Sequence, residues 1–232
     1  MINAKNELHF LFLNIKAFIN FKIKCLFASI LYGHFIFYKN KKKYLENNKN
    51  KKLHLGANKN IEGFLNSQIT SRLPINITKV LPFDSDTFDI IFSTHVIEHI
   101  HRKQISLFIK ECFRILKPGG INIICTPSIK KISKISYSDN IEKKKILFNR
   151  QNKWHNDDLK SACHQINLTM RNFGHRFILD DEYCEWLAKK NGYSKFKCIE
   201  INEMSDESIK KYLLNEKSDV WFAESDIYIL TK

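Results

Sequence analysis

The hydrophobic and polar positions of residues 50–232 alternate in blocks that predict strands and helices in turn. Residues 102–116 repeat apolar side chains at helical spacing, which predicts a helix with one buried face formed by Ile105, Phe108, Ile109, Cys112 and Leu116. Four runs before this helix have the length and apolar, β-rich composition of strands, at 52–56, 64–69, 75–80 and 87–93.

The helix at 102–116 has a clear stop signal. KPGG at 117–120 ends it, because proline cannot continue a helix and glycine supplies a left-handed cap. GINIICTP at 120–127 then predicts another buried strand, and a strand, helix and strand without a hairpin predict a right-handed parallel crossover. Helices at about 157–172, 180–193 and 205–216 and strands at 196–202 and 226–232 complete a doubly wound α/β domain.

The first fifty residues have a different pattern. Residues 8–38 are strongly apolar but contain Lys16, Lys22 and Lys24, and a basic run follows at 39–44. The longest charge-free piece is shorter than the roughly 20 residues that a bilayer span needs, and no signal-peptide cleavage site follows. Two interpretations stay open for a helical extension at 1–50 ahead of a domain at 51–232: a helix that packs on that domain, or peripheral contact of residues 8–44 with an anionic membrane surface.

The charge of this 232-residue chain is concentrated in two segments. Residues 1–52 contain eleven lysines and two glutamates, residues 130–150 contain six lysines and one arginine against Asp139 and Glu142, and together they account for the whole net charge of +14. Because the rest of the chain is neutral overall, we expect no nucleic-acid partner. None of the six cysteines forms a C-x-x-C pair, which favours a reducing, cytoplasmic location.

Residues 95–99, HVIEH, match the H-x-x-E-H signature of one class of zinc proteases. In that class both histidines and the glutamate project from one helix. Here a strand leads almost directly into the motif, and the sequence marks no distant third ligand. We therefore expect no metal, and zinc hydrolysis is the least favoured function.

The residues around HVIEH resemble the class I S-adenosylmethionine-dependent methyltransferases. In that family LPF precedes a fourth strand that begins with F-D, an H-x-x-E-H stretch follows, and a helix ends in E-x-x-R-x-L-K-P-G-G before the fifth strand. The positions that match are Leu81, Pro82, Phe83, Phe88, Asp89, Ser93, His95, Glu98, His99, Glu111, Arg114, Leu116, Lys117, Pro118, Gly119 and Gly120.

Two further segments, 53–66 and 173–193, resemble a subgroup of small, type 11-like methyltransferases that are associated with bacterial surface-polysaccharide genes. The resemblance covers about residues 50–232. It implies a Rossmann-like sheet of seven strands, mainly parallel with an antiparallel last strand, and S-adenosylmethionine as cofactor. The implied reaction is methylation of a small molecule or a sugar or glycan precursor.

The resemblance also implies a cofactor site, from which this sequence departs. Gly56 keeps the first position of the turn after the first strand, but Ala57 and Asn58 replace the next family residues. Gln68 stands where the family has an acid for the ribose hydroxyls, and Asn76 is the nearest candidate for the adenine. The other implied contacts are Leu81, Ser93 and His95. Two interpretations follow: an active methyltransferase with a weakened site, or a degenerate, non-catalytic relative that acts as a binding or scaffold subunit.

Transfer to a hydroxyl or amine requires a general base. The candidates are His95, His99 and Glu98 in HVIEH and His175 in FGHRF, with His99 favoured and His175 second. The lysine-rich segment 128–150 is predicted to be a loop or mobile lid. Lys130, Lys131 and Lys134 either attract an anionic substrate there or are simply solvated.

Overall fold

A computed structural model describes residues 19, 20, 23, 34–68, 73–142, 144, 145, 147, 149, 161–215 and 224–232. Within them, six strands form one sheet in the order β2-β1-β3-β4-β6-β5. β2, β1, β3 and β4 are parallel, whereas β6 is antiparallel to both of its neighbours. The strands are β1 (Lys52–Leu55), β2 (Phe64–Ser67), β3 (Phe88–Thr94), β4 (Leu116–Pro127), β5 (Lys195–Ile199) and β6 (Ser225–Thr231). The predicted α/β class, with a mainly parallel sheet and an antiparallel last strand, is confirmed.

The predicted strand at 75–80 is wrong, and the described sheet has six strands instead of seven. The chain turns there: Lys79 N donates to Asn76 O over 3.2 Å, and Asn76 Oδ1 accepts from Thr78 N over 3.0 Å. An asparagine side chain that bonds its own backbone offers an alternative to a sheet ladder. Leu73 and Ile75 are still buried, so the apolar pattern was satisfied by packing without strand pairing.

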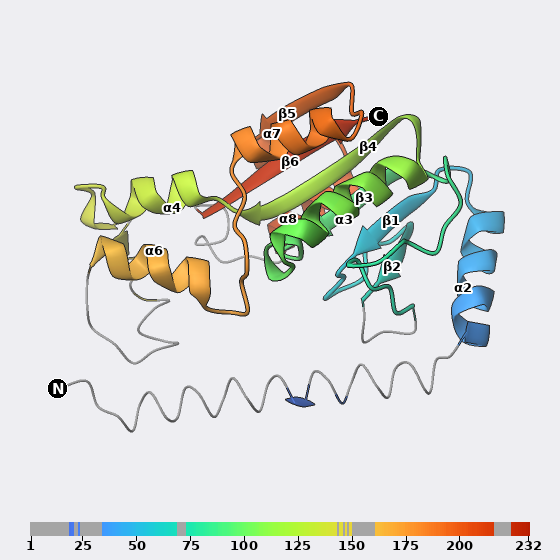
Figure 1. Ribbon diagram of the computed structural model, residues 1–232, viewed down its shortest axis with the longest axis horizontal. Coiled ribbons are helices and arrows are strands. Elements are labelled where there is room, and N and C mark those ends of the chain that lie inside the picture. Colours follow the sequence, from blue (N-terminus) through green and yellow to red (C-terminus); the bar gives the residue numbers. More distant parts are fainter. Residues whose placement is uncertain are drawn as a thin grey trace.

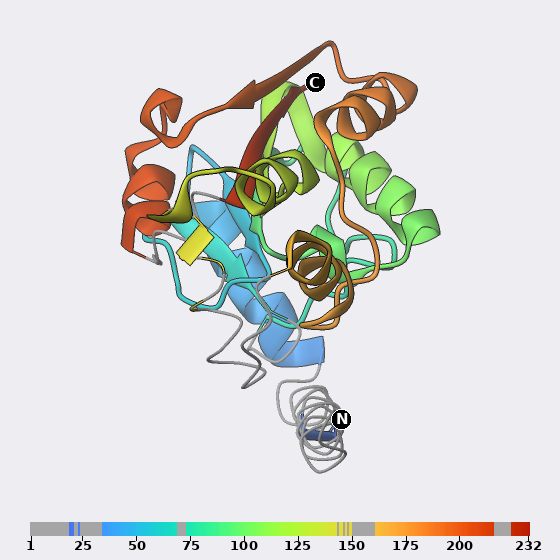
Figure 2. The same ribbon diagram turned by 90° about the vertical axis from the view of Figure 1, so that its left-hand side faces the viewer.

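Helices cover both faces of the sheet, and in Figure 1 α4 and α6 lie beyond the tips of the parallel strands. The end-on view of Figure 2 shows these two helices side by side in front of the sheet. The described helices are α2 (His34–Asn47), α3 (Arg102–Ile115), α4 (Ile129–Ser136), α6 (Ala162–Arg171), α7 (Asp181–Lys190) and α8 (Glu207–Asn215), with short 3-10 turns η1 (Ile97–His99) and η2 (Ile201–Glu203).

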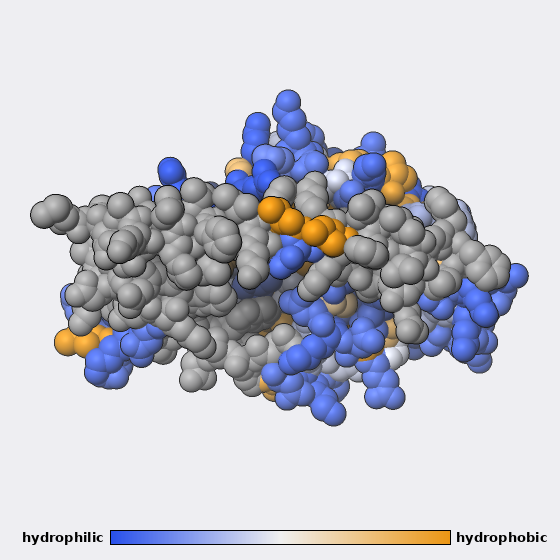
Figure 3. All heavy atoms as spheres, turned by 90° about the horizontal axis from the view of Figure 1, so that it is seen from below, coloured by the Kyte–Doolittle hydropathy of each residue, from blue (hydrophilic) through white to orange (hydrophobic). Residues whose placement is uncertain are grey.

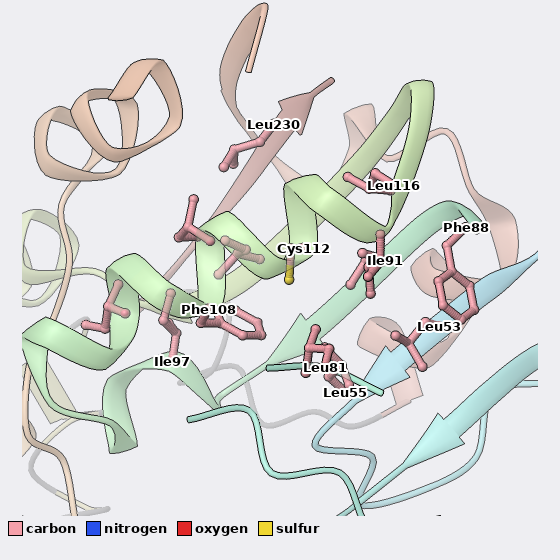
Figure 4. Close-up of a cluster of buried hydrophobic side chains, with 14 of the residues drawn as sticks. Leu53, Leu55, Leu81, Phe88, Ile91, Ile97, Phe108, Cys112, Leu116 and Leu230 are labelled. Atoms are coloured by element: carbon pink, nitrogen blue, oxygen red, sulfur yellow. The ribbon is translucent and has the colours of Figure 1, made fainter. Parts of the chain in front are cut away.

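Two hydrophobic clusters fill the two faces, because successive side chains of a strand point to opposite sides. Ile91 of β3 belongs to the cluster with Phe108 and Cys112 of α3, which Figure 4 shows. Phe92, the next residue, belongs to the cluster with Ile209 of α8. The buried face predicted for α3 is confirmed, except that Leu116 already begins β4, which also contains KPGG.

The prediction of an irregular loop or lid at 128–150 is wrong for its first part. Residues 129–136 form α4, and Ser128 caps it by accepting a hydrogen bond from Lys131 N over 3.1 Å. Ile132 and Ser136 are buried. The segment is amphipathic, because isoleucines recur every three residues from Ile129. Its many lysines made this helical spacing hard to recognise in the sequence.

α2 packs on the domain. Phe37 is buried in the same cluster as β1 and α3. The Tyr44 hydroxyl lies 2.9 Å from Lys52 O, 2.9 Å from Lys52 N and 2.8 Å from Gly63 O. The basic run 39–44 is therefore part of a helix that contacts the domain, whereas residues 8–33 lie outside the described part apart from Ile19, Asn20 and Ile23.

The helices in the described ranges are all too short or too polar to cross a bilayer. On the face seen in Figure 3, the coloured residues are mostly hydrophilic and the hydrophobic ones form small groups.

Candidate active site

The carboxyl ends of β1, β2 and β3 meet at one edge of the sheet. Leu55, the last residue of β1, pairs with Ser67 of β2 and with Ser93 of β3. Gly56, Gln68 and His95 follow these strands and so leave the sheet at the same edge, which is where ligands bind in open α/β sheets.

Gly56 is in the left-handed region, with φ of 76°. A Cβ atom at this position would lie 2.0 Å from Val96 Cγ2, so only glycine fits. Ala57 N then donates to Ser67 O over 3.0 Å, and Gln68 Nε2 lies 3.4 Å from Asn58 Oδ1. The structure thus brings together the predicted cofactor residues of the first turn and of the second strand.

The other predicted cofactor residues differ in position. The buried Ser93 hydroxyl makes no hydrogen bond to any residue that the structure describes. Leu81 is a core residue, whose amide donates to Glu111 Oε2 over 2.8 Å. Asn76 is exposed and its Oδ1 accepts from Thr78. The structure thus gives Leu81 and Asn76 other partners, and their role toward a cofactor remains a prediction.

Glu98 lies in η1, directly after β3, and is 0% exposed. Thr126 Oγ1 donates to Glu98 Oε2 over 3.2 Å, whereas Oε1 accepts no hydrogen bond from the residues that the structure describes. Burial raises the pKa of this carboxyl to about 8, since burial favours its neutral form.

Two predicted bases from distant segments meet beside Glu98. The rings of His99 and His175 pack edge to face, with centroids 5.0 Å apart. Arg176 N and Phe177 N donate to Glu98 O over 2.7 and 3.2 Å, so the segment that carries His175 is fixed to η1. The three predicted catalytic residues are therefore one cluster, and their ligand atoms lie within 4.8 Å of one another.

His95 lies between this cluster and the sheet edge where β1, β2 and β3 end. It has a left-handed backbone, with φ of 49°. Its Nδ1 lies 3.3 Å from Glu98 Oε1, and its Nε2 lies 3.1 Å from Ser225 Oγ. The sequence did not mark Thr126 or Ser225. Thr126 could have been found from its place at the end of the fifth-strand motif, but no local signal points to Ser225.

The lysines of α4 mostly have acidic partners. Lys130 Nζ lies 2.5 Å from Asp181 Oδ1, and Lys131 Nζ lies 3.4 Å from Asp226 Oδ1. These pairs weaken the hypothesis that Lys130 and Lys131 attract an anionic substrate.

A comparison with protein families identifies part of this chain. Residues 49–124, which contain the Gly56 turn and the HVIEH motif, match the family model described as a methyltransferase domain. The match covers a third of the chain. It confirms the resemblance to the class I S-adenosylmethionine-dependent methyltransferases, whereas the association with surface polysaccharides stays a prediction.

Among curated proteins, one from Mycolicibacterium smegmatis that is named a probable S-adenosylmethionine-dependent methyltransferase is 38% identical over 48 residues. The match spans 21% of this chain and 18% of that protein, so the chain covers about a fifth of its relative.

Solved structures resemble the chain only weakly. A SAM-dependent methyltransferase from Archaeoglobus fulgidus has a TM-score of 0.45 at 10% identity, over 88% of this chain and 94% of that one. An S-adenosylmethionine-dependent methyltransferase from Mesorhizobium loti has a TM-score of 0.47 at 9% identity, over 78% of this chain and 90% of that one.

Proposed function

We propose that this protein is an S-adenosylmethionine-dependent methyltransferase that binds its cofactor at the Gly56 edge and its acceptor at the cluster of Glu98, His99 and His175. The matches to a methyltransferase domain and to a probable S-adenosylmethionine-dependent methyltransferase support the class. The observation that carries the proposal is a contact. Val96 packs against Gly56 and lies between His95 and Glu98, so the two predicted sites are neighbours.

The residues at this edge fit the cofactor. Gly56 gives the turn a left-handed backbone without a side chain, Gln68 has an amide that can bond a hydroxyl, and the buried Ser93 hydroxyl makes no hydrogen bond to the described residues. A neutral amide binds more weakly than the usual acid, because the hydrogen bond lacks a charge. S-adenosylmethionine supplies an electrophilic methyl group when bound.

The cluster supplies the base. Burial, the largest effect, lowers the pKa of His99 from its ordinary value of 6.5, so the ring is neutral near neutral pH and can accept a proton. Its Nε2 faces Glu98 Oε1 over 4.0 Å. The proton of a hydroxyl or amine acceptor is taken by His99, and the buried Glu98 side chain beside it orients the ring.

The acceptor is a small molecule or a sugar or glycan precursor, and the protein acts in the cytoplasm. The resemblance of 53–66 and 173–193 to methyltransferases associated with surface-polysaccharide genes supports this choice. One observation favours the alternative, a non-catalytic binding or scaffold subunit. The side chain of Asn76, the residue predicted to contact the adenine, accepts a hydrogen bond from Thr78, and residues 75–80 do not form the predicted strand.

Calorimetric titration of the full chain with S-adenosylmethionine and S-adenosylhomocysteine tests the proposal. The full chain is required because Phe37 of α2 is part of the core. We expect one site with micromolar affinity for both compounds. Absence of binding to a folded chain would reject the enzyme and favour the scaffold subunit.

A further inference from the structure

Two histidines and one carboxyl group, those of His99, His175 and Glu98, converge near the sheet edge, where Glu98 is buried and both histidines are partly exposed. The sequence predicted no metal because HVIEH lacked a distant third ligand. The fold brings His175 to that position. We propose that these three side chains hold one divalent first-row cation, such as Zn²⁺ or Mn²⁺, at the acceptor side of the active site.

Glu98 is the strongest single observation. Its carboxyl group is completely buried, and within the described part of the chain its Oε1 accepts no hydrogen bond, although His95 Nδ1 lies 3.3 Å away. Buried carboxyl oxygens are normally hydrogen-bonded, paired with a charge or bound to a metal. Thr126 occupies Oε2 over 3.2 Å, which orients Oε1 toward the two histidines in the way that outer hydrogen bonds orient metal ligands.

The histidines are held in the tautomer that a metal requires. His175 Nδ1 lies 2.5 Å from Thr169 O, so this nitrogen carries the proton and Nε2 carries the lone pair. His99 forms a hydrogen bond with the Gly174 backbone, with Nδ1 on the side of that glycine, and its Nε2 lies toward Glu98. Metal-bound histidines typically donate their second N–H to a backbone carbonyl in this way.

Ligand type and number limit the choice of cation. Ligand atoms around a cation with bonds of roughly 2.1 Å lie about 3–3.5 Å apart, so binding draws the cluster slightly closer than its present 4.8 Å limit. Imidazole and carboxylate together suit first-row transition metals better than calcium. Three protein ligands leave a position open, as in catalytic metal sites.

This inference rests on the proposed function in one respect, because the open position would hold the oxygen or nitrogen of the methyl acceptor. A cation there lowers the pKa of a bound hydroxyl. In the metal-bound protein His99 and His175 would be ligands, and the hydroxyl proton would pass to solvent water instead of to either ring.

Metal binding can be measured directly. The full chain is purified without a metal-affinity tag, stripped with chelator and titrated with Co²⁺, whose visible absorption reports coordination by nitrogen and oxygen. The variants are Glu98→Gln and His175→Ala. The control is His101→Asn, which removes an exposed histidine that contacts the same segment through Arg176. Circular dichroism checks that each variant is folded.

We expect one Co²⁺ per chain, displaced by Zn²⁺, with affinity at least about tenfold weaker in both cluster variants and unchanged in His101→Asn. Absence of stoichiometric binding, or equal binding by all folded variants, would overturn the metal site. Titration with S-adenosylmethionine on the same preparations separates the two proposals. Cofactor binding without metal binding rejects only the metal, whereas metal binding without cofactor binding rejects the methyltransferase.

Discussion

Gly56 and Val96 are in contact across the edge where β1 and β3 end, and a Cβ atom on Gly56 would lie 2.0 Å from Val96 Cγ2. Val96 begins the segment that contains Glu98 and His99. The turn predicted to approach the cofactor is therefore in contact with the segment predicted to carry out proton transfer. A substitution at Gly56 should therefore affect both the turn after β1 and the segment that contains Glu98 and His99.

Gly56→Ala should weaken S-adenosylmethionine binding at least about tenfold in calorimetry. The left-handed backbone costs a non-glycine residue roughly 1–2 kcal/mol, and the new methyl group must displace Val96.

Gly63→Ala is the matched control, because Gly63 has a similar φ of 78° but nothing within 4 Å of its Cβ position. It should carry the backbone strain without the collision and leave cofactor affinity nearly unchanged. Equal affinity losses in the two variants would show that strain alone is responsible and that the Gly56–Val96 contact is irrelevant.

Glu111→Gln should lower the free energy of unfolding by about 2 kcal/mol in urea titrations. The Glu111 carboxylate binds Arg114 Nη2 over 2.6 Å and Leu81 N over 2.8 Å, and Arg114 in turn donates to Phe83 O over 2.7 Å. The control is Glu185→Gln, whose partner Lys189 is 71% exposed, and it should cost under about 0.5 kcal/mol. A similar effect of both changes would contradict a structural role for the Glu111 pair.

The same pair should make the protein sensitive to acid. The Arg114 hydrogen bond, the largest effect, holds the pKa of Glu111 below its ordinary value of 4.5. The unfolded chain therefore binds a proton at this site before the folded one does. The stabilisation is complete above the ordinary pKa and is lost as the pH falls through the lowered one.

Unfolding free energies measured from neutral pH into the acid range should thus fall less steeply in Glu111→Gln than in the unchanged protein. Parallel curves would mean that other carboxyl groups cause the acid sensitivity.

Tyr44→Phe should destabilise the fold by roughly 1–2 kcal/mol, because the phenol is the polar link between α2 and the start of β1. Lys52 N would lose its acceptor while remaining partly buried. Thermal unfolding measures the change. Tyr137→Phe is the control, since Tyr137 is 68% exposed, and an equal shift in melting temperature would argue that α2 is not anchored through this hydroxyl.

Local pattern in the sequence determined most of the elements. The apolar spacing of α3 and the buried runs of β1, β3 and β4 depend on side chains only a few residues apart. Their ends were predicted to within one residue, except that β4 begins four residues before its predicted start. The motif from Leu81 to Gly120 also predicted that Glu98 and His99 follow a strand, and in the structure they lie in η1, directly after β3. The sequence-based prediction was wrong in two places. At Asn76 a side-chain hydrogen bond to the backbone replaced the predicted strand, and in α4 the many lysines made the helical spacing of the isoleucines hard to recognise.

Only the tertiary structure decided which distant residues meet. His175 reaches Glu98 and His99 because the backbone of Arg176 and Phe177 bonds to η1. Ser225 reaches His95 because β6 runs antiparallel beside β4. Hydrophobic periodicity specifies the buried face of an element but not its neighbour across the sheet, so the complete cluster of two histidines and one carboxylate became visible only after the strands were ordered.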